Sequence, residues 1–545
     1  MKKKLIYLLT AIFCLSACSN QAENTSSNSG ISNAIYDKSV KVKVLGYTEN
    51  YLGNETAKDN TWTRLYQSYN IKTEIIKKDE MNIYNFPDIL AFDTTNMEAI
   101  VNADVLMDIS DLLDKYASDE LMQYLTSNGN NALEGATYDG KLYGLPCIQD
   151  TYNKPYVLCI RRDWLDNLGL KVPETMADLA DIAYQFTYND PDKNGKNDTY
   201  GIGISTTNPF YKYMSLSGVF QAFGAIPAYN SSDYTFIEKD GKIIWGGLET
   251  EKMKQALAWL KDLQLKGCTS NIYLSLSPDR VLENVLYGKC GIFWTKADEN
   301  MLPAYYTYKQ EPDVEFIVLP NLDGTGTGEN INYIPNTTSQ YFAVSKKCKN
   351  PEVLIYFMNM AVEKMVNPSS VEEYEMYVGD GENYTGYACS ATPILPSERQ
   401  YKTYKAVKKA FETGNQEVLK DGSIAYGDVS DLYQTINDIN NGLISQTGET
   451  YASLAVSKMI CAPNNSYYSA IESIIENQKF TYNAYNGYHT ETMKNNVESL
   501  NKLFVDAIIS IIRDEKPVDY YDEFVEEWKT QGGQEVLDEV NRLKN

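Results

Sequence analysis

One short acidic loop has the residue types and spacing for metal binding. Asp190 and Asp192 are followed by Asn194, and Gly195 supplies the turn that a calcium loop needs at its sixth position. Gly201 stands at the twelfth position, where a bidentate Glu is usual, so another acid or water would have to complete the site. We expect a structural calcium loop, and the alternative is an ion-free turn, because Asp, Asn and Gly favour turns. The predicted ligands are Asp190, Asp192, Asn194, the carbonyl of Lys196, and Asp198.

A second candidate for chemistry is the thiol of Cys18. A basic start and an apolar run over residues 5–13 lead to Leu15-Ser16-Ala17, a small-residue site typical of secretory signals. The following cysteine resembles a bacterial lipobox, in which the thiol is acylated. We therefore expect a signal peptide at 1–17, and a lipidated Cys18 with a Ser- and Asn-rich flexible tether over 18–38, at the outer face of the cell membrane. The alternative is an ordinary signal with a chance cysteine.

Composition excludes several kinds of function. The formal net charge is −24, and it becomes −27 without the three lysines of the signal, so nucleic-acid binding is not expected. His489 is the sole histidine, which excludes a two-histidine zinc site, and its polar surroundings predict a surface loop. Seven cysteines remain beyond Cys18, with irregular spacing and no C-x-x-C pair, so free thiols are expected rather than a disulfide framework.

Short strand-like runs alternate with helical ones along the first half of the chain. Residues 42–45, 72–76 and 87–92 read as strands, and such alternation predicts an α/β fold. Ligands of such folds bind beyond the carboxyl ends of the strands. This rule places the following polar residues near a site: Tyr47, Glu49, Asn50, Asp93 and Thr94.

Further strands and helices are predicted from the same sequence patterns. Residues 156–160, 290–294 and 340–345 are strand-like, and Thr175 is a plausible N-cap for a helix that runs through Phe186. The last third is helix-rich, with amphipathic runs at 399–413, 492–513 and 534–543. Tyrosine is abundant, at 44 residues, and its flat ring with a hydroxyl edge suits sugar binding.

Five ordered motifs carry a family resemblance. Together they resemble the extracellular solute-binding proteins of ABC importers, family 1, the carbohydrate-binding class with lipoprotein members. The resemblance covers about residue 40 to 545. Besides the lipobox, the motifs are Asp139-Gly140-Lys141-x-Tyr143-Gly144-x-Pro146, Arg162-Asp163-Trp164-Leu165-x-x-Leu168-Gly169, Phe342-Ala343-Val344-Ser345 and Phe524-Val525-Glu526-Glu527-Trp528.

The resemblance implies a two-lobe periplasmic-binding-protein-like clamshell of type II. We expect the N-terminal lobe to comprise 39–152 plus 292–340, and the C-terminal lobe 153–291 plus 341–545. Such a protein is a monomer without enzymatic activity, which holds a carbohydrate, here expected to be an oligosaccharide, in the cleft and hands it to a membrane permease. Ligand-binding candidates beyond those above are Asp150, Tyr152, Tyr211, Trp294 and Tyr333.

Two alternatives stay open on the sequence alone. A peptide- or amino-acid-binding receptor on the same fold would place charged groups in the cleft to meet the ligand's termini. A surface glycoside hydrolase would need two carboxylates about 5–9.5 Å apart in a cleft. The many acidic residues do not exclude the hydrolase, although no hydrolase motif stands out.

Overall fold

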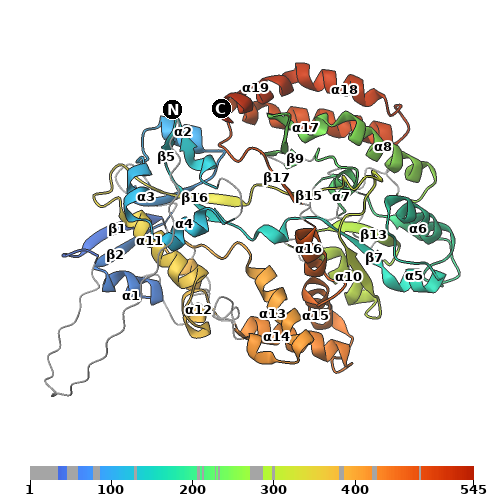
Figure 1. The fold of residues 1–545 in the computed structure, drawn as a ribbon, viewed down its shortest axis with the longest axis horizontal. Coiled ribbons are helices and arrows are strands. Elements are labelled where there is room, and N and C mark those ends of the chain that lie inside the picture. Colours follow the sequence, from blue (N-terminus) through green and yellow to red (C-terminus); the bar gives the residue numbers. More distant parts are fainter. Residues whose placement is uncertain are drawn as a thin grey trace, which may run out of the picture.

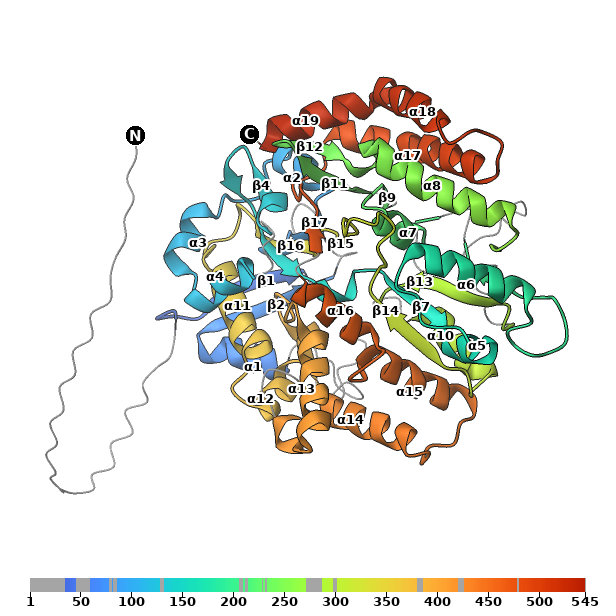
Figure 2. The same cartoon turned by 45° about the vertical axis from the view of Figure 1, so that its right-hand side comes forward.

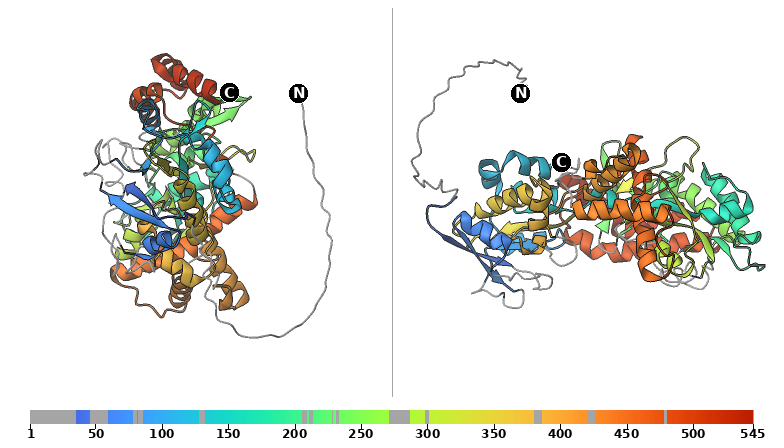
Figure 3. Two further views of the ribbon diagram at one scale, coloured as in Figure 1. Left: turned by 90° about the vertical axis from the view of Figure 1, so that its left-hand side faces the viewer. Right: turned by 90° about the horizontal axis from the view of Figure 1, so that it is seen from below.

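The computed structural model shows two lobes side by side along the long axis of the molecule (Figure 1; Figure 3, right panel). Each lobe is built on its own β-sheet and has its own hydrophobic core. The predicted α/β clamshell with a helix-rich C-terminal part is therefore confirmed. The structure describes residues 35–45, 59–77, 81, 86–127, 132–204, 209–210, 214–227, 229–230, 233–270, 287–297, 301–379, 386–419, 426–477 and 480–544.

The first lobe contains a sheet with the strand order β2-β1-β3-β16-β6 in the described part of the chain. Strands β1, β2 and β3 are parallel, whereas β16 runs antiparallel to both β3 and β6. The strands are β1 Val40–Leu45, β2 Ile71–Ile76, β3 Ile89–Phe92, β6 Leu145–Ile148 and β16 Thr338–Val344. Strands β1, β2, β3 and β16 lie close to the runs expected from sequence, whereas β6 was not predicted as a strand.

Short helices cover this sheet and share its core. A small hairpin, β4 Thr137–Tyr138 and β5 Lys141–Leu142, projects from the lobe. Its turn residues Asp139 and Gly140 both have positive φ, as a two-residue hairpin turn requires. The helices are α1 Thr61–Ser68, α2 Met97–Asn102, α3 Ser110–Tyr116, α4 Asp119–Leu125, α11 Val353–Ala361 and α12 Val371–Tyr377.

The second lobe contains a sheet with the order β14-β7-β13-β8 among the described residues. Its strands are β7 Val157–Arg161, β8 Tyr200–Ile202, β13 Cys290–Thr295 and β14 Phe316–Leu319. Strand β7 is buried along its whole length, and its residues alternate between two cores. Leu158 and Ile160 pack on one face and Val157 and Cys159 on the other, because successive strand side chains point to opposite faces.

Helices cover both faces of the second sheet, which makes a three-layer lobe (Figure 2). One face carries α5 Arg162–Leu168, α6 Met176–Tyr188, α7 Ser217–Ala222, α8 Thr250–Leu265, α17 Glu491–Ile512, α18 Tyr520–Trp528 and α19 Gln534–Lys544. The other carries α10 Leu302–Gln310, α13 Arg399–Thr413, α14 Tyr426–Asn440, α15 Gly448–Cys461 and α16 Tyr467–Glu476.

Small two-stranded ribbons complete the lobe. They pair β9 Tyr229–Asn230 with β10 Asp233–Tyr234, β11 Phe236–Lys239 with β12 Lys242–Trp245, and β15 Asn332–Ile334 with β17 Phe480–Tyr482.

Local sequence signals explain several element boundaries. Thr175 caps α6 as predicted, since its hydroxyl accepts the N–H of Asp178 at 3.1 Å while the carboxylate of Asp178 accepts the N–H of Thr175. Gly169 ends α5 in the left-handed conformation, with φ 66°. Both signals act within one turn of helix, so sequence alone suffices to place them.

The predicted lobe boundaries need correction beyond residue 290. Strands β13 and β14 pair with β7, so most of the segment 292–340 belongs to the second lobe. Strand β16 pairs with β3 and β6, and the residues after it, up to Ile394, share the first core. The N-terminal part of 341–545 therefore lies in the first lobe. The error arose because partner choice within a sheet depends on tertiary contacts that the strand pattern does not encode.

Three further observations bear on the expectations above. The seven cysteines from Cys147 onward are all free thiols. Within the described ranges, no helix combines the length and the apolar character that crossing a bilayer requires. The signal peptide 1–17, Cys18 and most of the tether 18–38 lie outside the described residues.

Candidate functional site

In each sheet, the same end of the strands faces the junction between the lobes. Phe92 ends β3 opposite Tyr341 of β16, and Ile148 ends β6 opposite Thr338. In the second lobe, Thr295 at the end of β13 pairs with Val157 at the start of β7. The carboxyl ends of the strands, where α/β folds bind ligands, therefore meet at the interlobe junction.

Three chain crossings join the lobes within the described residues, and they lie side by side. They are residues 149–156, 335–337 and 395–398, between elements of the two cores. The N–H of Gln149 donates to the carbonyl of Thr337 at 2.8 Å, and that of Thr151 donates to Ser397 at 2.7 Å. Because each crossing is hydrogen-bonded to a neighbour, they form one hinge. The change of lobe predicted between residues 291 and 292 is wrong, since β13 is inside the second sheet.

A cavity of about 420 Å³ lies at this hinge and is lined by both lobes. Its wall combines the tyrosine ring of Tyr387, which is 39% exposed, with amide, carboxylate and guanidinium groups and with apolar side chains. We call it the hinge cavity. The lining residues are Cys147, Ile148, Gln149, Asp150, Gln340, Tyr387, Pro393, Ile394, Leu395, Pro396, Arg399 and Gln400.

Asp150 is the carboxylate of the hinge cavity. Its Oδ2 accepts the backbone N–H of Gln400 at 2.9 Å, in the first turn of α13, where the helix dipole favours a negative charge. Its Oδ1 is buried and has no hydrogen-bond partner in the structure. Burial raises the pKa of Asp150 to about 6, against the lowering effect of the backbone N–H groups of Gln400 and Tyr152. Asp150 thus ties the first crossing to α13.

An aromatic cluster stands beside Asp150. The half-buried ring of Tyr152 lies 5.2 Å from that of Tyr401 and 5.8 Å from that of Phe480, centroid to centroid. Burial raises the pKa of Tyr152 well above its ordinary value, so the phenol stays protonated and can donate a hydrogen bond. The cluster combines stacking faces with hydroxyl groups, which is the mixture that sugars require.

A segment near the C-terminus makes a further contact between the lobes. We define the clasp as residues 483–490, which follow β17. The ring of Tyr488 lies 4.9 Å from that of Tyr138, and the N–H of His489 donates to the carbonyl of Thr94 at 3.1 Å. Nearby, Lys544 at the end of α19 pairs with Glu134 at 3.5 Å. The clasp thus joins the second lobe to the carboxyl edge of the first sheet.

His489 was predicted to lie at the surface, and this is wrong. The side chain is only 8% exposed, because the loop that carries it is packed between the lobes. A polar composition suggested a solvated loop, but here the polar groups are used in an internal contact.

The predicted ligand-binding residues lie in different places in the structure. Tyr47, Glu49, Asn50 and Tyr211 lie outside the described residues. Asp93 and Thr94 follow β3 at the junction, but the exposed Asp93 accepts hydrogen bonds from the N–H groups of Thr95 and Asn96, which form the turn before α2. Asp150 and Tyr152 lie together in the first crossing.

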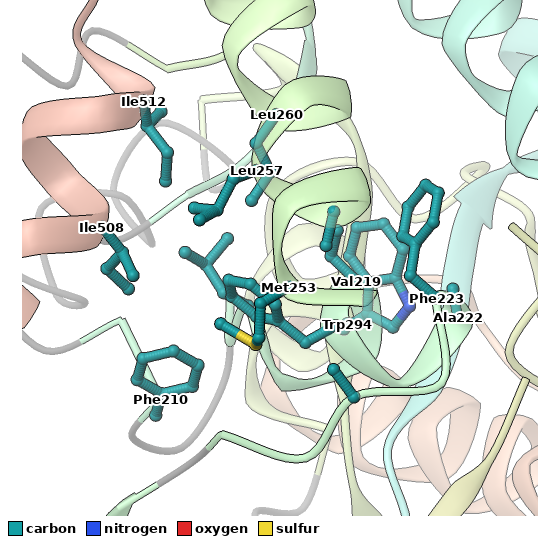
Figure 4. Packing of buried hydrophobic residues seen from close by; sticks show 14 of the residues in the cluster. Phe210, Val219, Ala222, Phe223, Met253, Leu257, Leu260, Trp294, Ile508 and Ile512 are labelled. Atoms are coloured by element: carbon teal, nitrogen blue, oxygen red, sulfur yellow. The ribbon is translucent and has the colours of Figure 1, made fainter. Parts of the chain in front are cut away.

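Tyr333 and Trp294 are both buried. Tyr333 is 7% exposed in β15, next to the hinge. Trp294 is 2% exposed and packs in the apolar core of the second lobe with Val219 and Phe223 (Figure 4). A Cβ at Gly218 would come within 2.0 Å of its indole, so no ligand has access to that face. The predicted sugar-stacking role of Trp294 is therefore corrected to a core role.

Sequence reasoning missed Tyr387, Gln340, Arg399 and Gln400. The helix over 399–413 was predicted with its correct bounds, but nothing indicated that its first turn faces the hinge. The prolines at 393 and 396 are breaker signals that could have located the third crossing.

The acidic loop keeps its oxygens close together without closing around an ion. Asp190 accepts the N–H groups of Asn194 and Gly195 at 3.0 Å each, and the Asn194 amide donates to Asp192 at 2.7 Å and to Asp198 at 3.2 Å. Partial burial and the carboxylates of Asp190 and Asp198 raise the pKa of Asp192. Among the described residues, no group of three or more His, Cys, Asp or Glu is arranged to hold a metal ion. The carboxylate, amide and carbonyl oxygens of the loop are nevertheless the kinds of donor that Ca²⁺ prefers.

The chain belongs to the family of bacterial extracellular solute-binding proteins, whose model matches residues 54–367. This is a family of binding proteins. The chain is similar to the polygalacturonan/rhamnogalacturonan-binding protein YtcQ of Bacillus subtilis, with 23% identity, covering 86% of this chain and 83% of that protein. It is similar to Lipoprotein LipO of the same organism, also with 23% identity, covering 100% and 98%.

A solved structure agrees in fold. An HMO-binding, ABC-transporter-associated solute-binding protein from Bifidobacterium longum infantis is 16% identical, covers 93% of this chain and 99% of its own, and gives a TM-score of 0.57. At this identity the likeness supports the two-lobe architecture.

Proposed function

We propose that the protein is the substrate-binding lipoprotein of an ABC importer and captures an oligosaccharide between its lobes. The hinge cavity is the observation that carries this proposal. It presents the exposed ring of Tyr387 beside Gln149, Asp150, Gln340 and Arg399, and both lobes contribute to it. A ring face for C–H stacking, surrounded by hydrogen-bonding groups, suits a polyhydroxylated ligand.

The family and the relatives support the same ligand class. One relative, YtcQ, is named for binding polygalacturonan and rhamnogalacturonan, and the family binds extracellular solutes. In this proposal the lobes close on the glycan by a hinge movement at the three crossings and deliver it to a membrane permease. The protein does not alter its ligand.

Anchoring and metal binding complete the proposal. Acylated Cys18 would hold the protein at the outer face of the membrane through the tether 18–38, and one relative is named a lipoprotein. The loop of Asp190, Asp192, Asn194, the Lys196 carbonyl and Asp198 would hold a structural calcium ion, far in sequence from the hinge residues.

A ligand screen tests the proposal. Thermal unfolding of the mature protein is measured with oligogalacturonides, neutral fructo- and malto-oligosaccharides, and peptides. A glycan present at about 100 times its Kd should stabilise the fold by about 2.7 kcal/mol. A shift with peptides and none with glycans would favour the peptide receptor instead, and release of shorter sugars on incubation would favour the hydrolase.

A further inference from the structure

A second cavity adjoins the hinge cavity and shares part of its wall. It has a volume of about 380 Å³ and lies where α13 packs against α14 and α15. Arg399 and Gln400, in the first turn of α13, line both cavities. We call it the outer cavity. Its lining residues are Arg399, Gln400, Thr403, Asp431, Leu432, Thr435, Ser457, Ile460 and Cys461.

The two cavities share Arg399 and Gln400 as part of their walls. Gln400 is exposed and Arg399 is half-buried, and the side-chain oxygen of Gln400 accepts the hydroxyl of Tyr468 at 3.0 Å. A ligand that occupied both cavities would pass along these two side chains.

The chemistry of the outer cavity suits the same kind of ligand as the hinge cavity. Asp431 supplies an exposed carboxylate acceptor, and Thr435 and Ser457 supply hydroxyl groups. Leu432 and Ile460 add apolar surface for the C–H faces of a sugar ring. The wall carries one cation, Arg399, and one anion, Asp431, among hydroxyl and apolar groups, a mixture that suits a hydroxyl-rich sugar unit better than a small ion.

We infer that the outer cavity is an extension subsite that receives the further units of an oligosaccharide whose first unit sits in the hinge cavity. This inference rests on the proposed function and deepens it, because it assigns the further units of the proposed oligosaccharide to the outer cavity. Arg399 and Gln400 would contact the linkage between the two sites.

A larger cavity of about 500 Å³ in the second lobe does not compete for this role. It is lined by residues of α10, β14, α14, α15 and the adjoining turns, including Tyr308, Glu315 and Lys458. It shares no lining residue with the hinge cavity.

The test combines a ladder of chain lengths with a variant that fills the outer cavity. Ser457→Trp places a large ring in the cavity, and the Ser457 hydroxyl is used only within its own helix, donating to Ser453. Ser453→Trp is the matched control, since Ser453 is on the same helix, makes the same kind of bond to Glu449, is exposed, and does not line the cavity. Affinities are measured by calorimetry for the dimer, tetramer and hexamer of galacturonic acid and of fructose.

We expect affinity to rise with chain length in the unmodified protein and in Ser453→Trp. Ser457→Trp should lower the affinity for the hexamer by about tenfold. This change corresponds to the loss of one or two hydrogen bonds, each of which contributes about 1 kcal/mol to the binding free energy. Its affinity for the dimer should stay within about twofold of the unmodified protein, a ratio worth less than 0.5 kcal/mol.

Asp431→Ala serves as a second variant. It removes an acceptor without adding bulk, and should weaken binding of the neutral fructose hexamer in the same selective way. Circular dichroism confirms that each variant is folded.

Three results would overturn the inference. If dimer and hexamer bind equally well, or if both tryptophan variants behave alike, the outer cavity is not a subsite, although the proposed function stands. If neither glycan series nor any other glycan binds, the proposed function fails and takes the subsite with it.

Discussion

Tyr387 is the residue on which the proposed sugar site most depends. It is 39% exposed and lines the hinge cavity, so its ring is available for stacking. We expect Tyr387→Ala to raise the Kd for the best glycan about tenfold, because loss of an aromatic anchor costs about 1–2 kcal/mol. Titration calorimetry measures this. Tyr188→Ala is the control, since Tyr188 is 45% exposed on α6 in the second lobe. Equal affinities for both variants would contradict the site.

Trp294 provides a residue-level test of the core assignment. Trp294→Phe leaves unfilled volume beside Val219 and Phe223 and should lower the free energy of unfolding by about 2 kcal/mol, a usual cost for shrinking a buried aromatic. Glycan affinity, measured well below the unfolding temperature, should not change. Urea unfolding and calorimetry give the two quantities. A large loss of affinity with unchanged stability would restore the stacking role that the sequence suggested.

Asp150 should make stability depend on pH in a defined direction. Burial raises the pKa of its carboxyl to about 6, above the ordinary value of about 3.9. The folded protein then binds more protons than the unfolded chain between these values, so the contribution of Asp150 to stability falls as pH rises from about 4 to about 6.

The difference in unfolding free energy between the native protein and Asp150→Asn isolates the contribution of the Asp150 carboxyl. Urea unfolding at several pH values should show the native protein losing stability relative to Asp150→Asn as pH rises through the window. Parallel profiles for the native protein and Asp150→Asn would mean that the carboxyl is solvated in the free protein.

At the scale of elements, the acidic loop after α6 is the segment most open to test. Asp190 and Gly195 adopt positive φ, and Asp190 accepts two backbone N–H groups, so the loop is tightly turned. Added CaCl₂ should raise the unfolding temperature, and EGTA should reverse the rise. At free Ca²⁺ about 100 times the Kd, the expected gain is about 2.7 kcal/mol.

A variant within the loop and one outside it make the calcium test specific. Asp192→Asn should abolish the calcium-dependent rise, whereas Asp166→Asn, on the exposed side of α5, should leave it intact. A rise that persists in Asp192→Asn would assign the calcium effect to another part of the chain.

At the scale of the whole molecule, the clasp joins the two lobes at one side. Its contacts, Tyr488 on Tyr138 and His489 to Thr94, must be broken if the lobes move apart at that edge. We expect Tyr488→Ala to increase the radius of gyration in small-angle scattering. The lost aromatic pair contributes about 1 kcal/mol, which changes the ratio of open to closed forms about fivefold. Tyr184→Ala on α6 is the control, and an unchanged radius in Tyr488→Ala would show that the clasp does not restrain opening.

Prediction from sequence succeeded where the controlling interactions are local. The start of α6 at Thr175, the end of α5 at Gly169 and the strand β7 were all readable, because caps, turns and alternation act over a few residues. It failed where the surroundings of a residue depend on partners that are distant in the sequence. Trp294 looked like a site residue because it ends a strand, yet Gly218 and Val219 pack over it.

The sequence by itself determined the kind of protein. The order of its motifs indicated a two-lobe solute-binding protein, and its single histidine and acidic surface excluded whole classes of chemistry. Tertiary structure decided which lobe receives β13 and β16, that Asp150 is buried against α13, and that His489 lies between the lobes. The reason is physical: strand partners, burial and pKa depend on groups far apart in the chain, which only the folded molecule brings together.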